Sequence, residues 1–465
     1  MTTHSTATKK KVFFGFIFVI VFLVGFFCIF KLINESSKIE KNLEDYLSVT
    51  EIPRFDIKTK DNIDYENKEY KKAEFTLKNE NYSGKIKPRG SSSFAMAKQH
   101  NGPYPYRIKL DEKAELLGLS NSKSYILLPN FIDPSGVRQF YHMNLASFVL
   151  DDWSPKTKYV EVYIDDIYYG LYLLSETIGH SDEQLKYKNG LGFITELDLQ
   201  GKTKITNKVY VGDNDFSIDY QVKPEESTAE KLREINLAFE LNDPDSFAET
   251  TEEHKNYIIN TLTDLHKNTA LNKKLDDLKI DINSFVKYFM LQEIFGNYGI
   301  GVGSTYYWND GELTHAGPFW DADRLTANYD TTGFINDEKI TKNSLYENLL
   351  KNSEYKNKIK SEFMNFYERA PKIKEALFAL KNNPTLKAAW ERNEELYHRL
   401  SRSDLDKNFS SNENVESRKT FEEQIDYIIG FYFDGFKGIT FWTENPEAKK
   451  FEPRVEWLKE HIDKW

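Results

Sequence analysis

The sequence is nearly free of cysteine, which limits how the fold can be held together. The chain of 465 residues contains one cysteine, Cys28, so it cannot form an intrachain disulfide and must be stabilised by packing. Basic residues are also in the minority: 62 Lys and Arg face 73 Asp and Glu, and the net charge is −11. This balance argues against a nucleic-acid partner, because phosphate backbones are bound through clustered Lys and Arg.

Several motifs of nucleotide and nucleophile chemistry are missing too. The sequence has no G-x-S-x-G elbow and no Walker A loop. The glycine-rich run 296–303 follows a predicted helix and precedes a predicted strand, which is the reverse of the order in the dinucleotide fingerprint. The histidines show no metal-ligand spacing; those considered are His180, His254, His266 and His315.

One long apolar run is present near the start of the chain. Residues 12–30, VFFGFIFVIVFLVGFFCIF, carry no charge and as a helix would span about 28 Å, close to the hydrocarbon thickness of a bilayer. No small-residue cleavage site follows, and three lysines, 9–11, precede the run. We therefore expect a cytoplasmic tail (1–11), a single-pass membrane anchor (12–33), a stalk helix (34–50) and an extracytoplasmic catalytic domain.

The remainder predicts two lobes of different secondary structure. From 51 to 223 the pattern is mostly short strands, interrupted by one helix over about 134–150 with Asp133 as its N-cap. From 224 to 465 helical periods dominate, with one hairpin over 304–320. The predicted helices in the first part of this region are 226–241, 252–267 and 283–296. This α+β order predicts a strand-rich first lobe, a helical second lobe and a cleft between them.

The segment directly after that hairpin has a pair of aspartates. Residues 317–330 are GPFWDADRLTANYD, with Asp321 and Asp323 one residue apart. Alternate residues of an extended segment face the same side, so this spacing can aim two carboxylates at one divalent cation. A polar turn would have the same composition.

Basic and hydroxyl residues earlier in the chain are suited to phosphate. The segment KPRGSSS (87–93) follows a predicted strand and supplies cations, a flexible glycine and three hydroxyls. Arg107 and Lys109 share one face of a predicted strand. Taken alone, the first segment also fits a strand-ending turn and the second fits a solvated strand face.

The order of the motifs is more informative than any one of them. From the N-terminus they are KPRGSSS (87–93), PYPYRIKLD (103–111), SYILLPNFIDPSGVR (124–138), YVEVYIDDIYYGLYLLSE (159–176), GFITELD (192–198), FMLQEIFGN (289–297), STYYW (304–308) and GPFWDAD (317–323). In this order they resemble the CotH kinase family, the spore-coat-type atypical protein kinases. The resemblance covers about residues 80–330, and the helices beyond match loosely.

This resemblance implies a bilobal, protein-kinase-like fold and phosphate transfer from ATP to hydroxyls, which we expect to belong to envelope proteins or glycans. It implies that Asp321 and Asp323 hold magnesium. The residues implied to lie at the nucleotide are Arg89, Ser91, Ser92, Ser93, Lys109 and Arg138. Those implied to act in catalysis are Lys109, Glu176 and Asp323. The chemistry agrees, since phosphoryl transfer needs cations and Mg²⁺ around spreading negative charge.

The sequence departs from the family pattern at the expected catalytic aspartate. Gly299 stands two residues after Asn297, where the family usually has an aspartate. Either Asp310 or Asp330 supplies the carboxylate, or the protein is a catalytically impaired pseudokinase or scaffold. A milder change is Gln139, which stands where the family usually has asparagine. A glycosyltransferase that uses the D-x-D pair is a further alternative, and it would require a parallel α/β sheet.

Overall fold

The computed structural model describes most of the chain. The described residues are 41–197, 214–222, 233–297, 304–323, 325–326, 344–401, 419–435 and 452–464. The chain forms two compact units, Met1–Asp45 and Tyr46–Trp465. Of the first unit only residues 41–45 are described, and they include the start of helix α2 (Leu43–Leu47).

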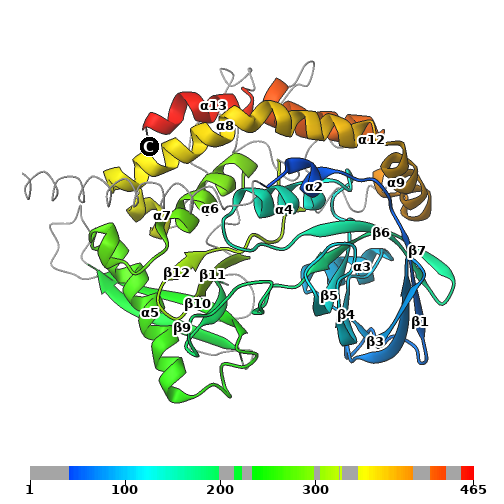
Figure 1. The fold of residues 1–465 in the computed structure, drawn as a ribbon, viewed down its shortest axis with the longest axis horizontal. Helices are drawn as coiled ribbons and strands as arrows, with labels where there is room; N and C mark the ends of the chain where they lie inside the picture. The colour runs from blue at the N-terminus through cyan, green and yellow to red at the C-terminus, as the bar shows by residue number, and fades with distance from the viewer. Residues whose placement is uncertain are drawn as a thin grey trace, which may run out of the picture. The chain divides into compact units, whose positions relative to one another are not determined.

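The first half of the second unit is a closed β-barrel (Figure 1). Its strands are β1 (Arg54–Thr59), β2 (Lys71–Leu77), β3 (Glu80–Pro88), β4 (Tyr106–Ala114), β5 (Ser122–Pro129), β6 (Thr157–Ile164) and β7 (Ile167–Glu176). They follow one another as β1-β2-β3-β4-β5-β7-β6, and a parallel pairing of β1 with β6 closes the ring. Closure leaves the barrel without exposed edge strands.

Alternation along each strand fills the barrel with apolar side chains. Phe55, Phe75, Ile108 and Leu127 come from different strands and are all fully buried in one core cluster. Within each strand the residues next to these inward-facing ones point outward, as expected for strands with a period of two. The β6–β7 turn has positive φ at Asp165-Asp166, which matches the right-handed twist of a tight hairpin.

A second, antiparallel sheet lies after the barrel in the sequence. Its strands are β8 (Phe193–Leu197), β9 (Asp215–Val222), β10 (Arg233–Asp243), β11 (Thr305–Asn309) and β12 (Thr314–Ala316), in the order β12-β11-β8-β10-β9. Of the described strands, only β1 and β6 pair in parallel. The parallel α/β sheet required by the glycosyltransferase alternative is therefore not found among them.

Helices pack on both sheets and on one another (Figure 1). Helix α3 (Ser92–His100) links β3 to β4, and α4 (Arg138–Val149) packs on β6 and α6 (Ile282–Phe295). Helix α5 (Glu252–Ala270) covers β9. The C-terminal helices are α7 (Ser344–Leu349), α8 (Ser353–Lys381), α9 (Pro384–Tyr397), α12 (Phe421–Ile429) with the π-helix η3 (Gly430–Asp434), and α13 (Arg454–His461). Single-turn 3₁₀ helices lie at Leu275–Asp277, Arg399–Ser401 and Ile462–Lys464.

The predicted α+β class is confirmed, with a sheet-rich first part and helices after it. The closed barrel was not predicted. The helix predicted over 226–241 is wrong where the chain is described, because residues 233–243 form β10 and pair with both β8 and β9. Long-range pairing here overrides the helix-favouring residues of this stretch. The helix predicted from Pro134 begins only at Arg138, after a turn. The lobe boundary near residue 223 stays a prediction.

The predicted membrane localisation is corrected. Among the helices that the structure describes, none is both long enough and apolar enough to cross a bilayer. The predicted anchor, residues 12–33, lies outside the described residues, as do the tail and the first part of the stalk. The single-pass localisation is therefore not retained.

The contact between the barrel and helix α9 yields a stability prediction. Gly170 in β7 has φ of 111°, and a Cβ there would lie 2.5 Å from Asn393 Oδ1, which accepts the N–H of Leu171. Gly118 also has a positive φ, but a Cβ there meets nothing within 4 Å. We expect Gly118→Ala to cost about 1 kcal/mol of unfolding free energy from backbone strain alone, and Gly170→Ala about 2–3 kcal/mol.

Urea denaturation of both variants measures the difference. Equal losses would show that the close approach of β7 and α9 does not depend on the glycine.

Candidate functional site

The two aspartates lie in the segment that follows β12, and hydrogen bonds to its backbone fix its course. The N–H of Phe319 donates to Ser154 Oγ at 3.1 Å, and the N–H of Ala322 donates to Gln139 Oε1 at 2.7 Å. Between these anchors Asp321 has φ of 65°, in the left-handed region that few non-glycine residues adopt. Ser304 Oγ donates to Asp321 Oδ2 at 3.1 Å. The backbone is thus held on both sides of Asp321.

The end of β3 and the start of α3 supply the facing groups. The N–H of Arg89 donates to the carbonyl of Pro105 at 2.9 Å, which fixes the chain where β3 ends. Gly90 then turns with φ of 85°, and a Cβ there would lie 2.4 Å from Ser93 Oγ. Ser91 stands at the N-cap position of α3 without a side-chain capping hydrogen bond, and Ser92 and Ser93 are the first residues of the helix. The first N–H groups of a helix lack intrahelical partners and carry partial positive charge, so this turn suits an anion.

These two segments meet at one cavity. The sequence-predicted residues that line it are Arg89, Ser92, Ser93, Asp321 and Asp323. The structure therefore brings together the cation, two of the three hydroxyls and both carboxylates, although they come from distant parts of the chain. The cavity volume is about 70 Å³, well below the roughly 300–1,000 Å³ of a pocket that encloses a whole ligand. It fits a phosphate group and a cation rather than an entire nucleotide.

The cavity combines opposite charges at close range. Arg89 is half-buried, Asp321 is exposed and Asp323 is half-buried. Burial lowers the pKa of Arg89, and the charges of Asp321 and Glu196 oppose that shift. Arg89 nevertheless stays positively charged, because arginine side chains are not deprotonated in proteins. Because it forms no ion pair with a described residue, its charge is available to an incoming anion.

The donor set fits magnesium. Within the described residues no group of three or more His, Cys, Asp or Glu side chains gathers as a metal site, so the Asp321–Asp323 pair stands without a third protein carboxylate. Magnesium commonly binds through one or two carboxylates and completes its octahedron with water and substrate phosphates. Two carboxylates beside a phosphate-sized cavity match that requirement.

Among the lining residues that were not predicted from sequence, three have polar or aromatic side chains. Gln139 accepts the N–H of Ala322 and also lines the cavity. Asn130 has a buried Nδ2 without a hydrogen-bond partner among the described residues, and Trp320 completes the wall. Asn130 lies in the motif SYILLPN, but no local pattern distinguishes it from a loop residue. For Gln139 the only signal in the sequence was that it replaces the asparagine usual in the family.

Other sequence-predicted residues lie away from the cavity. Lys109 is exposed on the outer face of β4. Glu176 is buried and accepts the N–H and hydroxyl of Ser120 at 2.6 and 2.7 Å and the N–H of Lys156 at 2.7 Å, so it joins two loops to the end of β7. Arg138 is fully buried and pairs with Asp133 at 2.5 Å. Its charge is paired within the core, and Arg138 does not line the cavity. The roles of all these residues stay predictions.

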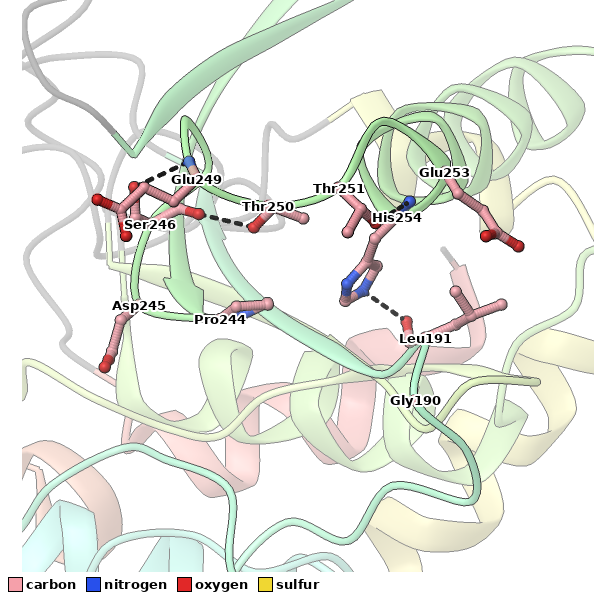
Figure 2. Close-up of a pocket in the computed structure, with 10 residues that line it drawn as sticks. All are labelled: Gly190, Leu191, Pro244, Asp245, Ser246, Glu249, Thr250, Thr251, Glu253 and His254. Carbon is pink, nitrogen blue, oxygen red and sulfur yellow. Dashed lines mark hydrogen bonds between the residues drawn. The ribbon is translucent and has the colours of Figure 1, made fainter.

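A larger, open cavity of about 560 Å³ lies between the loop before β8 and the start of α5 (Figure 2). It is lined by carboxylates and hydroxyls, and the imidazole of His254 donates from Nε2 to the carbonyl of Leu191 at 3.0 Å. Among the described residues that line it, none is lysine or arginine. Its carboxylates, Asp245, Glu249 and Glu253, would repel phosphate, so this cavity is not the candidate site.

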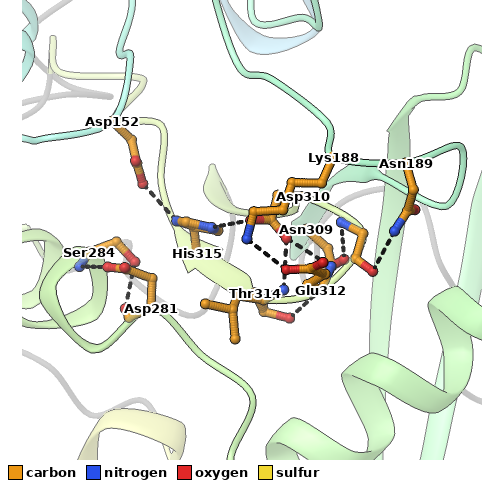
Figure 3. A network of polar contacts seen from close by, with 12 residues as sticks. Asp152, Lys188, Asn189, Asp281, Ser284, Asn309, Asp310, Glu312, Thr314 and His315 are labelled. Carbon is orange, nitrogen blue, oxygen red and sulfur yellow. Dashed lines mark hydrogen bonds and ion pairs between the residues drawn. The ribbon is translucent and has the colours of Figure 1, made fainter.

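The alternative carboxylate Asp310 belongs to a polar network at the β11–β12 turn (Figure 3). Its Oδ1 accepts the N–H groups of Glu312 and Leu313, both at 2.8 Å, and its Oδ2 lies 2.9 Å from Lys188 Nζ. Asp310 does not line the cavity around Asp321. It stabilises a turn and is not placed to meet an acceptor hydroxyl there. The other alternative, Asp330, and the departing residue Gly299 lie outside the described residues.

The same network predicts a pH dependence of stability through His315. Burial alone would lower the pKa of His315, but the hydrogen bond to Asp152 at 2.9 Å and the charges of Asp152, Asp281 and Asp310 outweigh it and raise the pKa. A raised folded-state pKa stabilises the protein fully below the unfolded value of about 6.5 and loses that effect as pH rises through the folded value.

We therefore expect His315→Gln to cost more stability at pH 6 than at pH 9, measured as the wild-type-minus-variant difference in unfolding free energy. Because wild type and variant both contain the buried neutral His142 and His266, the contributions of these two histidines cancel in the difference. A constant cost across this range would contradict the ion pair.

Comparison with known proteins shows the family of the chain. A search of curated proteins found no significant match. The family model described as CotH kinase protein matches residues 86–434. The match covers most of the chain and includes every residue named above as lining the cavity. The resemblance predicted from the order of the motifs is thereby confirmed, and the chain belongs to the CotH kinase family.

Proposed function

We propose that the protein binds ATP with Mg²⁺ at the cavity around Asp321 and transfers the terminal phosphate to hydroxyl groups of a protein or glycan acceptor. One observation carries the proposal: Arg89, the first turn of α3 and the Asp321–Asp323 pair line a single phosphate-sized cavity. In this proposal the barrel serves as the first lobe of a bilobal, protein-kinase-like fold. The helices that follow the second sheet form the other lobe.

The acidic residues of the cavity would bind the metal, and its positive groups would bind phosphate. Asp321 and Asp323 would hold Mg²⁺, which neutralises charge that develops on the transferring phosphate. Arg89 and the N–H groups at the start of α3 would bind the phosphate oxygens and orient the terminal group. Such preorganised positive groups supply most of the stabilisation in phosphoryl transfer, because the protein has little covalent chemistry to perform.

The rest of the nucleotide requires space outside the small cavity, and the outer face of β3 and β4 is suited to its phosphates. Lys87 lies opposite Arg107 across the two strands, and Lys85 lies opposite Lys109. None of these four cations forms an ion pair with a described residue. Like charges directly opposite one another repel, and burial together with Arg107, Lys68 and Lys85 lowers the pKa of Lys87. A bound polyanion would relieve this repulsion.

Gly299 favours a second candidate, a protein that binds nucleotide with little transfer. The carboxylate that would orient the acceptor hydroxyl is replaced there by a residue without a side chain. Asp323 would then have two roles, with one carboxylate oxygen on Mg²⁺ and the other accepting the hydroxyl proton. Formation of ADP and phosphorylated casein from ATP, compared between wild type and Asp323→Asn, separates the two candidates: activity that depends on Asp323 supports transfer, and none in either protein supports binding alone.

Removal of the first aspartate tests the metal assignment. Asp321→Asn should abolish the Mg²⁺-dependent part of the rise in melting temperature that ATP produces, because a ligand stabilises only the state that binds it. The melting temperature without ligand should hardly change, since Asp321 is exposed and accepts one side-chain hydrogen bond from Ser304. The exposed Asp182 provides the control variant, Asp182→Asn. An unchanged Mg²⁺-dependent shift in Asp321→Asn would overturn the assignment.

Removal of positive charge from the outer face of β3 and β4 tests whether this face binds the phosphates of the nucleotide. The double variant Lys87→Gln/Arg107→Gln should weaken ATP binding about tenfold or more, with a smaller effect on AMP, because two phosphate-binding cations at roughly 1 kcal/mol or more each are lost. Lys113→Gln, an exposed lysine at the other end of β4, is the control. Isothermal titration with ATP, ADP and AMP gives the affinities. Equal losses for ATP and AMP would place the phosphates elsewhere.

A further inference from the structure

Helix α4 holds the metal-site segment at two points. Gln139 and His142 lie three residues apart on α4 and therefore on the same side of the helix. Gln139 Oε1 accepts the N–H of Ala322 at 2.7 Å, and His142 Nε2 lies 3.0 Å from Thr326 Oγ1. The two contacts lie on either side of Asp323 in the sequence. One helix face thus sets the start and the end of the short stretch that carries this carboxylate.

The protonation of His142 follows from its partners. Burial lowers the pKa of His142 to about 3, so the ring is neutral at physiological pH. Its Nδ1 lies 2.7 Å from the carbonyl oxygen of Arg138, which can only accept. Nδ1 therefore carries the proton, and Nε2 is an acceptor with a single lone pair.

A tyrosine from the C-terminal helices completes the contact. Tyr432 belongs to the π-helix η3, and its hydroxyl lies 2.6 Å from His142 Nε2 and 2.9 Å from Thr326 Oγ1. Nε2 can accept a hydrogen bond from only one of the two hydroxyls. Either Tyr432 donates to Nε2 and Thr326 donates to Tyr432, or Thr326 donates to Nε2 and Tyr432 donates to Thr326. All three side chains are buried, so the triangle of His142, Thr326 and Tyr432 satisfies polar groups that water cannot reach. π-Helical turns are frequent at functional sites.

The backbone of this stretch needs such support. Thr326 has φ of 59° and Asp321 has φ of 65°. A positive φ is uncommon for any residue other than glycine and is strained for a β-branched one, at roughly 1–3 kcal/mol. Without outside contacts the segment would relax and move the carboxylates. Surrounding structure must therefore determine the conformation. Gln139, His142 and Tyr432 contact the segment through their side chains. Ser304 donates to Asp321, and the carbonyl of Phe295 accepts the N–H of Thr326 at 3.3 Å.

We propose that Gln139, His142 and Tyr432 are positioning residues that hold the chain at Ala322 and at Thr326 and so set the spacing of the two carboxylates. This inference rests on the proposed function for its effect on Mg²⁺, although the positioning itself can be measured without any ligand. It has a specific consequence: Tyr432, which does not line the cavity, controls the affinity of the metal site from the C-terminal helices.

Tyr432→Phe is the decisive variant, because it removes the hydroxyl and leaves the ring in place. The matched control is Tyr355→Phe. Tyr355 is equally buried, and its hydroxyl donates to the carbonyl of Phe285 at 3.0 Å, outside the segment. Tyr432→Phe removes a buried hydroxyl with two hydrogen-bond contacts, and Tyr355→Phe removes one with a single contact. A purely structural role would lower the melting temperature of both variants and change nothing else. Gln139→Met, which removes the acceptor for Ala322 at similar volume, is the second variant.

Hydrogen exchange of the full chain without ligand is the first readout. We expect faster amide exchange in a peptide covering residues 319–326 for Tyr432→Phe and Gln139→Met, and wild-type exchange there for Tyr355→Phe. Unchanged exchange in both test variants would overturn the proposal. This result is independent of nucleotide binding, so it remains informative if the proposed function fails.

The Mg²⁺ midpoint is the second readout, taken from melting temperatures at a fixed ATP concentration. Loss of groups that orient metal ligands typically weakens metal binding about tenfold or more, so we expect the midpoint of Tyr432→Phe to rise about tenfold while that of Tyr355→Phe stays at the wild-type value. Equal midpoints in wild type and Tyr432→Phe would overturn the proposal. If wild type itself shows no Mg²⁺-dependent shift, the proposed function fails and hydrogen exchange alone decides the positioning role.

Discussion

The hydrogen bond between the backbone N–H of Ala322 and the buried side chain of Gln139 is the interaction on which the candidate site depends. Ala322 is fully buried and lies between Asp321 and Asp323. A buried N–H group must find an acceptor, and Gln139 supplies one from α4. The two carboxylates follow from this constraint, because their Cα atoms flank the anchored residue. The triangle around His142 then fixes the chain where it leaves the site.

Charge in this protein is distributed so that a net-acidic chain still offers an anion site. The net charge is −11, yet the outer face of β3 and β4 presents cations that no described carboxylate neutralises. Arg89 connects this face to the cavity, because it directly follows β3 and lines the cavity. The open cavity near α5 shows the opposite pattern, because carboxylates line it and none of its described lining residues is lysine or arginine. Local placement of charge therefore distinguishes the candidate site better than total charge or cavity size.

The sequence predicted those parts of the site that short patterns encode. The KPRGSSS and WDAD segments indicated phosphate and metal chemistry, and the structure brings both to one cavity. Contacts between segments distant in sequence could not be predicted. Closure of the barrel depends on the β1–β6 pairing, β10 is a strand because of partners on both sides, and Glu176 is tied to loop atoms. Nothing local to Tyr432 reveals that it reaches α4.

The central claim is that Asp321 and Asp323 hold a divalent cation next to a nucleotide's phosphates. The most direct measurement is a crystal structure with Mn²⁺ and a non-hydrolysable ATP analogue, with the anomalous signal of manganese used to place the metal. The account predicts an anomalous peak within coordination distance of both carboxylates, with phosphate oxygens in the same shell and Arg89 beside them. A peak elsewhere, or a bound nucleotide that leaves the cavity around Asp321 unused, would contradict it.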